Sequence, residues 1–391
     1  MQQTSQLAAR LDSLPNELLL NILAHLPPPR ISLGSASAPS QRNELFAVQL
    51  TSKRLKDLCT PTLWERLEMD IGPAGRGETS RVVGQLRASQ ERARACRKLR
   101  LEAFDWGFLP PFDGPGERLL PNVEELGMRE TMPITLDVVA RFEQLRHLNI
   151  EYAELLPPSS QVVFANLERM SLAAVTVRLP PSRSASFFDT SNVPTLRQVS
   201  LGPMFVDRPT RDDEDDDNAA GAAVFSPALV RSLDQLHLEL ESVHTHCDGV
   251  VPVETLGPDA PVLWHAELGA RAPPFFGLFP PAVPLAFLYI TLSDDRSDGT
   301  TVPQLRRLIA AHPFLRLVLV PLEFWRAAPR TSRPGADGPD AASASASFEA
   351  VVAECAARGL AVRPYDAGRE REGFVPREAV QFWREEGVGR T

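Results

Sequence analysis

A short apolar pattern recurs along the chain from residue 96 onward, and it limits the possible fold more than any other feature. The pattern is apolar-x-x-apolar-x-apolar, and its last two positions, two residues apart, suit a strand with one buried face. The clear copies are Cys96/Leu99/Leu101, Val123/Leu126/Met128, Leu145/Leu148/Ile150, Leu167/Met170/Leu172, Leu196/Val199/Leu201 and Leu233/Leu236/Leu238. Weaker copies are Leu263/Ala266/Leu268, Leu285/Leu288/Ile290, Phe314/Leu317/Leu319 and Ala357/Leu360/Val362. The pattern therefore predicts an array of short strands.

The proline content supports many short elements. The chain has 36 prolines in 391 residues, about 9%, whereas an ordinary protein has about 5%. Because proline interrupts helices and central strands, this content argues against a long coiled coil and against an all-helical bundle.

The spacing of the copies indicates a type of repeat. Their first positions are 27, 22, 22, 29 and 37 residues apart, and steps of 22 residues fall within the range of leucine-rich repeats. Five residues after each clear copy stands a side chain that is neither charged nor polar: Trp106, Pro133, Leu155, Val177, Val206 and Val243. The array therefore resembles an irregular leucine-rich-repeat solenoid. Its Asn or Cys ladder position holds residues that cannot make the ladder's hydrogen bonds: Phe104, Thr131, Ala153, Val175, Met204 and Glu241.

The resemblance implies an α/β fold with a parallel sheet. We expect a small helical domain over 11–69, a helical linker over 70–95, the solenoid over 96–365, and a C-terminal cap or tail over 366–391. In that tail, a helix around Pro376–Glu386 would cover the solenoid's open end with Phe382 and Trp383.

Two segments of the solenoid, 207–223 and 330–347, are expected to be disordered loops. The first contains six consecutive acidic residues, 212–217, which repel one another. The second is rich in Pro, Gly, Ala and Ser. Capture of a basic target tail is the alternative use of the acidic run.

The residues between the inward positions alternate onto one exposed face of the predicted sheet. They are mixed and polar, which is the character of a concave surface that binds another protein. The candidate target-binding residues are Glu125, Arg129, His147, Asn149, Glu151, Arg169, Gln198, Gln235 and His237. A sheet face that is merely solvated is the alternative interpretation.

The N-terminal segment carries more apolar surface than about sixty residues can easily bury on their own. A helix is expected from Pro15, which suits a first helical turn, to Leu26, before three consecutive prolines. Its apolar residues cover roughly 200° of arc, whereas a surface helix needs a stripe of roughly 100°. A second helical stretch follows Asn43 and is interrupted by Pro61. The surplus apolar surface packs either on the rest of the chain or on a partner protein.

The same segment resembles an F-box. The run Leu14–Leu23 follows that family's LPxELLxxIL pattern, and the basic pair Lys53-Arg54 is followed ten residues later by Trp64. Two features depart from the family: Thr51 stands where members usually carry Val, and the link over 28–42 is longer than usual.

F-box proteins bind the Skp adaptor of the SCF ubiquitin ligase through this segment. The resemblance implies that the adaptor contacts are made by Leu14, Pro15, Leu18, Ile22, Leu26, Leu50, Lys53, Arg54 and Trp64. It also implies a non-catalytic substrate-recognition subunit of a cullin-RING ligase, with an unknown protein substrate directed to ubiquitination and proteasomal degradation. A ligase-independent leucine-rich-repeat scaffold is the alternative.

Charge and cysteine usage exclude other partner classes. With 41 Lys+Arg against 50 Asp+Glu, the net charge is −9, which argues against nucleic acid and anionic membranes as partners. The four cysteines are far apart and form no CxxC, so neither a zinc ribbon nor a disulfide framework is predicted. Since no secretory signal or membrane-spanning stretch is evident, we expect a soluble protein of the cytoplasm, the nucleus or both.

The chain contains no GxSxG, P-loop, GxGxxG or HExxH motif, so we expect neither enzymatic activity nor a cofactor. The nearest approach to a metal site is His244 and His246, which would need a distant third ligand such as His265. We favour a structural or solvated role for these histidines and expect no metal.

Overall fold

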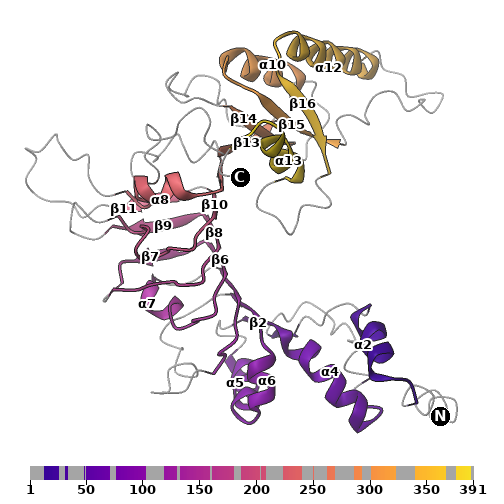
Figure 1. Cartoon of the computed structure of the whole chain (residues 1–391), viewed down its shortest axis with the longest axis vertical. Helices are drawn as coiled ribbons and strands as arrows, with labels where there is room; N and C mark the ends of the chain where they lie inside the picture. Colours follow the sequence, from indigo (N-terminus) through magenta and orange to yellow (C-terminus); the bar gives the residue numbers. More distant parts are fainter. Residues whose placement is uncertain are drawn as a thin grey trace, which may run out of the picture. The chain divides into compact units, whose positions relative to one another are not determined.

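The computed structural model describes residues 13–25, 31–33, 48, 50–70, 76–102, 119–129, 133–158, 161–179, 186–202, 204–207, 223–239, 250, 262–268, 286–292, 301–322, 340–366 and 376–388 (Figure 1). The chain forms two compact units. The first comprises Met1–Glu168 with Asn192–Thr195, and the second comprises Arg169–Ser191 with Leu196–Thr391.

The first unit begins with helices and continues into a parallel sheet. Its described helices are α2 (Asn16–Ala24), α4 (Lys53–Glu65), α5 (Arg76–Arg87), α6 (Gln90–Ala95) and α7 (Leu136–Val139). Its described strands are β1 (Ile31–Leu33), β2 (Arg66–Asp70), β3 (Lys98–Glu102), β4 (Glu125–Arg129), β5 (Ile134–Thr135), β6 (His147–Glu151) and β7 (Glu154–Leu156). The order across the sheet is β1-β2-β3-β4-β6, with each strand parallel to the next.

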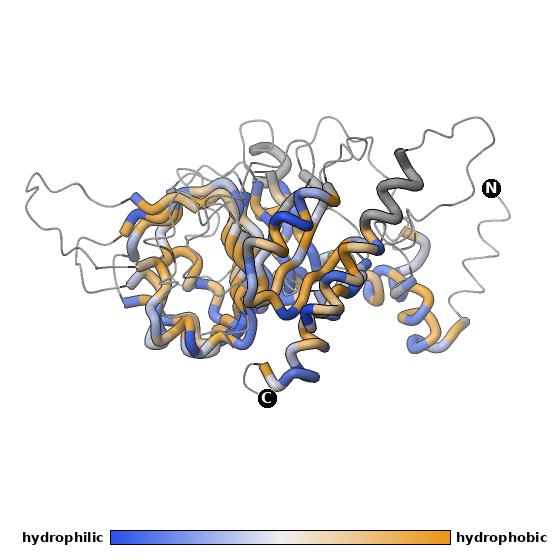
Figure 2. The backbone as a smooth tube through the Cα atoms, turned by 90° about the horizontal axis from the view of Figure 1, so that it is seen from above, coloured by the Kyte–Doolittle hydropathy of each residue, from blue (hydrophilic) through white to orange (hydrophobic). Residues whose placement is uncertain are grey.

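The apolar pattern determines which face of each strand is buried. In β3, β4 and β6 the second and fourth residues are buried, while the first, third and fifth are half-exposed. The backbone tube in Figure 2, which is coloured by hydropathy, alternates between hydrophobic and hydrophilic stretches. Leu99 and Leu101 therefore point inward, as the pattern predicts, and the charged residue between them, Arg100, lies on the opposite face.

The N-terminal helices continue directly into the sheet. Helix α4 ends at Glu65 and β2 begins at the next residue, Arg66. Strand β1 comes from the long link between α2 and α4, and it pairs with β2 so that Ile31 lies beside Leu67. The segment expected to be a helical linker contains α5 and α6.

Helix α4 differs from the expected second helix. It begins at Lys53, because the Ser52 side chain caps it by accepting a hydrogen bond from the Leu55 amide at 3.2 Å. In the preceding part of the expected stretch Val48 is helical and residues 50–52 are not, while 43–47 and 49 lie outside the described residues. It also continues through Pro61 without a break, so the expected interruption there is wrong.

The second unit continues the same architecture. Its described strands are β8 (Arg169–Ala173), β9 (Val175–Arg178), β10 (Gln198–Leu201), β11 (Met204–Asp207), β12 (Gln235–Glu239), β13 (Val262–Leu268), β14 (Phe287–Leu292), β15 (Leu317–Pro321) and β16 (Ala361–Tyr365). Its described helices are α8 (Pro227–Ser232), α10 (Thr301–Ala311), α12 (Asp340–Ala357) and α13 (Arg377–Glu385). Strands β8-β10-β12-β13-β14-β15-β16 follow one another in parallel. The predicted class, a solenoid-like α/β fold with a parallel sheet, is confirmed.

Short strands form a second layer. Strands β5 and β7 pair in the first unit, and β9 and β11 pair in the second, both in parallel. Between β6 and β7 the chain turns at Tyr152 with φ of 53°, and between β8 and β9 it turns at Ala174 with φ of 52°. These two residues therefore occupy equivalent corners with left-handed backbone conformation.

The C-terminal helix α13 lies on one face of the sheet. Its Phe382 and Trp383 are buried in a cluster with Phe287, Leu317 and Leu319. The ring centroids of Phe287 and Trp383 are 5.7 Å apart in an edge-to-face arrangement. The helix thus covers the face of β13–β16, whereas the sequence predicted that it would cover the open end.

One weaker copy of the repeat pattern has the wrong register. It predicts that Leu317 and Leu319 share the inner face with Leu288, but Leu288 is paired with Val318. Leu317 and Leu319 consequently lie on the α13 face. Every residue of β15 is buried, so its sequence carries no alternation from which the inner face could be read.

The expectation of a disordered loop over 330–347 is wrong for its last part. Helix α12 begins at Asp340, eight residues before the helix expected at Phe348. The intervening stretch is rich in alanine, which has the highest helix propensity. Within the other expected loop, 207–223, residues 208–222 lie outside the described part of the chain.

Candidate functional site

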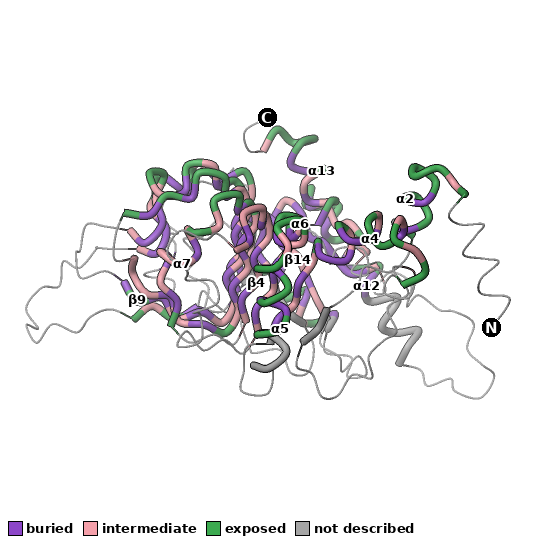
Figure 3. Tube along the Cα trace, turned by 90° about the horizontal axis from the view of Figure 1, so that it is seen from below, coloured by how far each residue is buried: buried purple, intermediate pink, exposed green. Residues whose placement is uncertain are grey.

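The leucines of α2 divide between two sides of the helix. Leu19 and Leu23 are 2% and 4% exposed, whereas Leu18 and Ile22 are 50% and 45% exposed (Figure 3). Each pair has the four-residue spacing that places both members on one side of a helix. Leu20, which was not among the expected contact residues, is exposed as well. Part of the apolar surface of α2 is therefore not used within the described chain.

A hydrogen-bonded arginine fixes α2 against α4. Arg54 Nη2 donates to the main-chain oxygen of Leu14 at 2.7 Å and to Oδ1 of Asn16 at 2.6 Å. Its Nε donates to the same Oδ1 at 3.0 Å. Arg54 therefore tethers the start of α2, immediately before the exposed leucines.

The other expected adaptor residues fall into three groups. Pro15 is exposed and precedes the first residue of α2, while Leu50 is 84% exposed and Lys53 is exposed too. Trp64 is buried, and the Arg92 guanidinium lies 5.0 Å from its ring centroid. Leu26 lies outside the described residues. The predicted adaptor contacts of all these residues remain predictions.

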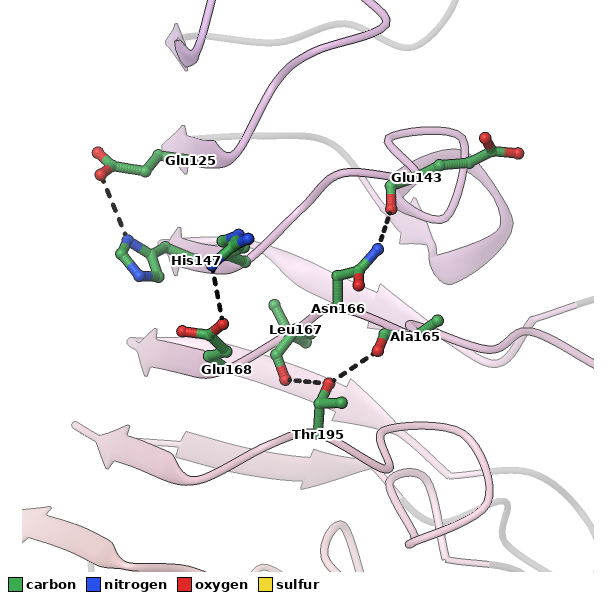
Figure 4. Close-up of polar contacts among 9 residues, drawn as sticks. Glu125, Glu143, His147, Ala165, Asn166, Leu167, Glu168 and Thr195 are labelled. Atoms are coloured by element: carbon green, nitrogen blue, oxygen red, sulfur yellow. Dashed lines mark hydrogen bonds and ion pairs between the residues drawn. The ribbon is translucent and has the colours of Figure 1, made fainter.

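Two candidate target-binding residues, Glu125 and His147, share one row of the first unit's sheet with Lys98. The register places Glu125 beside Lys98 and His147. Lys98 Nζ lies 2.9 Å from the Glu125 carboxylate, and His147 Nδ1 lies 3.3 Å from it (Figure 4). The hydrogen bond from His147 is the main reason that the pKa of Glu125 is lowered to about 2. Glu125 is therefore a stable negative charge between Lys98 and His147.

A second group on the same face lies at the ends of β4 and β6. Arg129 Nε is 3.8 Å from the Glu151 carboxylate, which also accepts a hydrogen bond from Asn149 at 2.9 Å. The Arg129 guanidinium lies 5.5 Å from the ring centroid of Tyr152. The structure thus brings Arg129, Asn149 and Glu151 together and adds Tyr152, which the alternating pattern did not single out.

The candidate residues of the second unit occupy equivalent positions. Gln198 lies beside Arg169 on one side and Gln235 on the other. One position along the same face, His237 Nδ1 is 2.9 Å from Ser200 Oγ. These residues share a face, as predicted, and target binding by them remains a prediction.

His237 lies in an aromatic cluster. Its ring centroid is 5.7 Å from that of His265 and 6.1 Å from that of Tyr289. Burial lowers the pKa of His237 to about 3, with a smaller contribution from His265. Its Nε2 has no hydrogen-bond partner among the described residues. His237 is therefore neutral at physiological pH.

Side chains three residues before the strands link successive repeats, and the sequence pattern did not single them out. Asn122 donates to the Arg94 carbonyl at 2.8 Å, and Asn166 donates to the Glu143 carbonyl at 2.9 Å. Thr195 donates to the carbonyls of Ala165 and Leu167 at 3.1 and 3.0 Å (Figure 4). Each donor directly precedes the first apolar residue of its repeat. A polar residue at that position was the signal that could have identified this ladder.

Of the three histidines considered for a metal site, only His265 lies within the described residues. His244 and His246 lie outside the described residues, while His265 Nε2 is 2.7 Å from Thr291 Oγ1. Within the described ranges, no group of three metal-ligating side chains is present. None of the described helices is long and apolar enough to cross a bilayer.

Comparison with known proteins locates one domain. No curated protein matches the chain. A family model described as F-box-like matches residues 11–70, the segment that contains α2, α4 and β2. Residues 11–70 are therefore an F-box-like domain, the kind of domain through which F-box proteins bind the Skp adaptor of SCF complexes.

Proposed function

We propose that this protein is a substrate-recognition subunit of an SCF-type ubiquitin ligase. The F-box-like domain would bind the Skp adaptor, and the polar face of the repeat sheet would bind a protein target. The observation that carries the proposal is the division of α2, in which Leu19 and Leu23 are buried while Leu18 and Ile22 are exposed.

The exposed side chains suit a helical partner. Leu18 and Ile22 form an apolar pair four residues apart, which is the spacing that packs into a groove of another protein. Leu50 adds a third exposed apolar side chain before α4. Covering them would remove apolar surface from water at a gain of roughly 25 cal/mol per Å².

The connection between helices and sheet suits an adaptor. Because α4 passes into β2 without an intervening residue, the proposed adaptor site belongs to the same compact unit as the row around Glu125. A target held on that face would be presented at a restricted distance from the ligase. Its lysines would then have a high effective concentration near the activated ubiquitin, and the chain itself would perform no chemical step.

Co-purification with the Skp adaptor and the cullin tests the proposal. The full chain should co-purify with both, and Ile22→Asp, at an exposed position of α2, should abolish this. The Ile22→Asp variant should still retain target proteins, and those proteins should be ubiquitinated by the reconstituted ligase only in the presence of the wild-type chain. Absence of adaptor binding by the full chain would refute the proposal.

The same experiment separates the alternative scaffold function. A ligase-independent repeat scaffold would bind the adaptor but neither recruit the cullin nor promote ubiquitination of its partner. In either case we propose that the protein acts in the cytoplasm, the nucleus or both.

A further inference from the structure

Tyr152 is an exposed aromatic residue at the end of β6, directly after the target-face residue Glu151. Its side chain is 56% exposed. Tyrosine is enriched at protein interfaces, because its ring is apolar while its hydroxyl group is polar.

The backbone at Tyr152 gives no reason for an aromatic residue. Its φ of 53° is a left-handed conformation, which is unfavourable for a bulky side chain. The equivalent corner in the next repeat has Ala174 with φ of 52°. The corner therefore requires the conformation, and alanine is sufficient to form it.

The ring is held in place by neighbouring residues. The Arg129 guanidinium lies 5.5 Å from the Tyr152 ring centroid, in the range of a cation–π interaction. Arg129 is in turn paired with Glu151, which accepts a hydrogen bond from Asn149. A side chain that is ordered before binding loses less conformational entropy when a partner arrives.

We infer that Tyr152 is the anchor of the target-binding face, and that its partner is a basic protein segment in which Lys or Arg stands beside an apolar residue. Tyr and Arg are the residues most enriched among those that dominate binding energies. The carboxylates Glu151 and Glu154 flank Tyr152 along the chain, and the net charge of −9 attracts basic partners. The partner's cation would pair with these carboxylates, and its apolar residue would cover the exposed part of the Tyr152 ring that the Arg129 guanidinium leaves open.

Fluorescence anisotropy with three labelled peptides tests this inference on the full chain. The peptides share the same leucines and carry Lys/Arg, Ser/Gln or Asp/Glu at all other positions. The wild type should prefer the basic peptide, and its affinity should fall as salt is added. Tyr152→Gly and Tyr152→Asn should weaken binding at least about 10-fold, whereas Tyr152→Phe should retain most of it.

Thermal unfolding separates binding from folding. Gly and Asn suit the left-handed conformation, so Tyr152→Gly and Tyr152→Asn should have an unchanged or raised Tm. Ala174→Gly is the matched control, with an unchanged or raised Tm and unaltered peptide binding. Equal binding by Tyr152→Gly, preference for the acidic or neutral peptide, or a fall in Tm that accompanies lost binding would overturn the inference.

The inference rests on the proposed function, because that function defines the target face. Adaptor affinity is therefore measured on the same preparations. Tyr152 variants should bind the Skp adaptor as the wild type does. Failure of the wild type to bind the adaptor would refute the proposed function, whereas peptide binding that is independent of Tyr152 would refute only the anchor.

Discussion

Arg54 donates two hydrogen bonds to one atom of Asn16, from Nε at 3.0 Å and from Nη2 at 2.6 Å to the same side-chain oxygen. Residue 16 is the first of α2, so this contact joins the helix that carries the exposed leucines to α4. The planar guanidinium makes this possible, since its donors are fixed in a fork.

Arg54→Ala should loosen α2. We expect a loss of about 1–2 kcal/mol in the unfolding free energy, because hydrogen bonds from a charged group are removed. Hydrogen exchange of the α2 amides should become faster. Arg54→Lys should not restore protection, since an ammonium lacks the fork, and Lys53→Ala, at an exposed neighbour, should leave exchange unchanged. Equal exchange in Arg54→Ala and wild type would contradict this role.

Asn166→Ala should weaken the link between repeats. The variant loses the 2.9 Å hydrogen bond to the Glu143 carbonyl, which should cost about 1 kcal/mol in urea unfolding. Gln144 occupies the same position in the preceding repeat and is exposed. Gln144→Ala should therefore change stability by less than about 0.5 kcal/mol, and an equal effect of both substitutions would argue against a specific ladder bond.

Glu125 should make stability depend on pH in acid. Its pKa is lowered to about 2, chiefly by the hydrogen bond from His147, so the folded state favours the carboxylate. The stabilisation is complete above the ordinary pKa of glutamate, about 4.3, and is lost as the pH falls toward about 2. Because Glu125 is partly exposed, screening reduces the effect to about 1 kcal/mol.

Urea unfolding of wild type and Glu125→Gln measures this effect. The difference in unfolding free energy should be largest above pH 5 and should shrink between about pH 4.3 and pH 2. Gln198→Glu, at an equivalent position of the second unit, controls for a general effect of a carboxylate on the face. A difference that does not vary with pH would rule out the proposed ionic stabilisation.

The positions of the strands and their buried faces could be predicted, because the alternation of apolar and polar residues can be read directly from the sequence. Leu126 and Met128 are buried and Glu125 is not, as the pattern requires. β1 could not be found in this way, because three residues in a proline-flanked link are too short to show a period. The register of β15 was predicted wrongly for a different reason. Both of its faces are buried, so its sequence does not alternate between apolar and polar residues.

The candidate site was predictable only where it depends on local spacing. The exposed side of α2 followed from the positions of Leu18 and Ile22. The position of α13 did not, because Trp383 packs on Phe287, nearly one hundred residues earlier in the sequence. The conformation of Tyr152 also escaped prediction, since left-handed residues are usually glycine or asparagine.

Trp383→Ala should destabilise the second unit. Trp383 is buried against Phe287, and removing a buried tryptophan typically costs about 3–5 kcal/mol. The melting temperature should fall and binding of a hydrophobic dye should increase. Arg384→Ala, at an exposed neighbour on the same helix, is the control. A melting temperature equal to that of the wild type would mean that α13 does not stabilise this face.

Leu19→Ala should destabilise the F-box-like domain, whereas Leu18→Ala should not. Leu19 is 2% exposed, and a buried Leu→Ala substitution costs about 2–5 kcal/mol. Leu18 is 50% exposed, so its truncation should change the unfolding free energy by less than about 1 kcal/mol. Equal destabilisation by the two substitutions would mean that both sides of α2 pack within the chain.

The affinity of the full chain for purified Skp adaptor, measured by titration calorimetry, tests the central claim most directly. Ile22→Asp places a charge on the proposed contact side, and Leu20→Asp places the same charge on an exposed leucine at a variable position of the F-box pattern. The account predicts that Ile22→Asp weakens binding at least about 30-fold, as expected for a dominant interface residue, and that Leu20→Asp retains it. Adaptor binding by Ile22→Asp equal to that of the wild type would contradict the account.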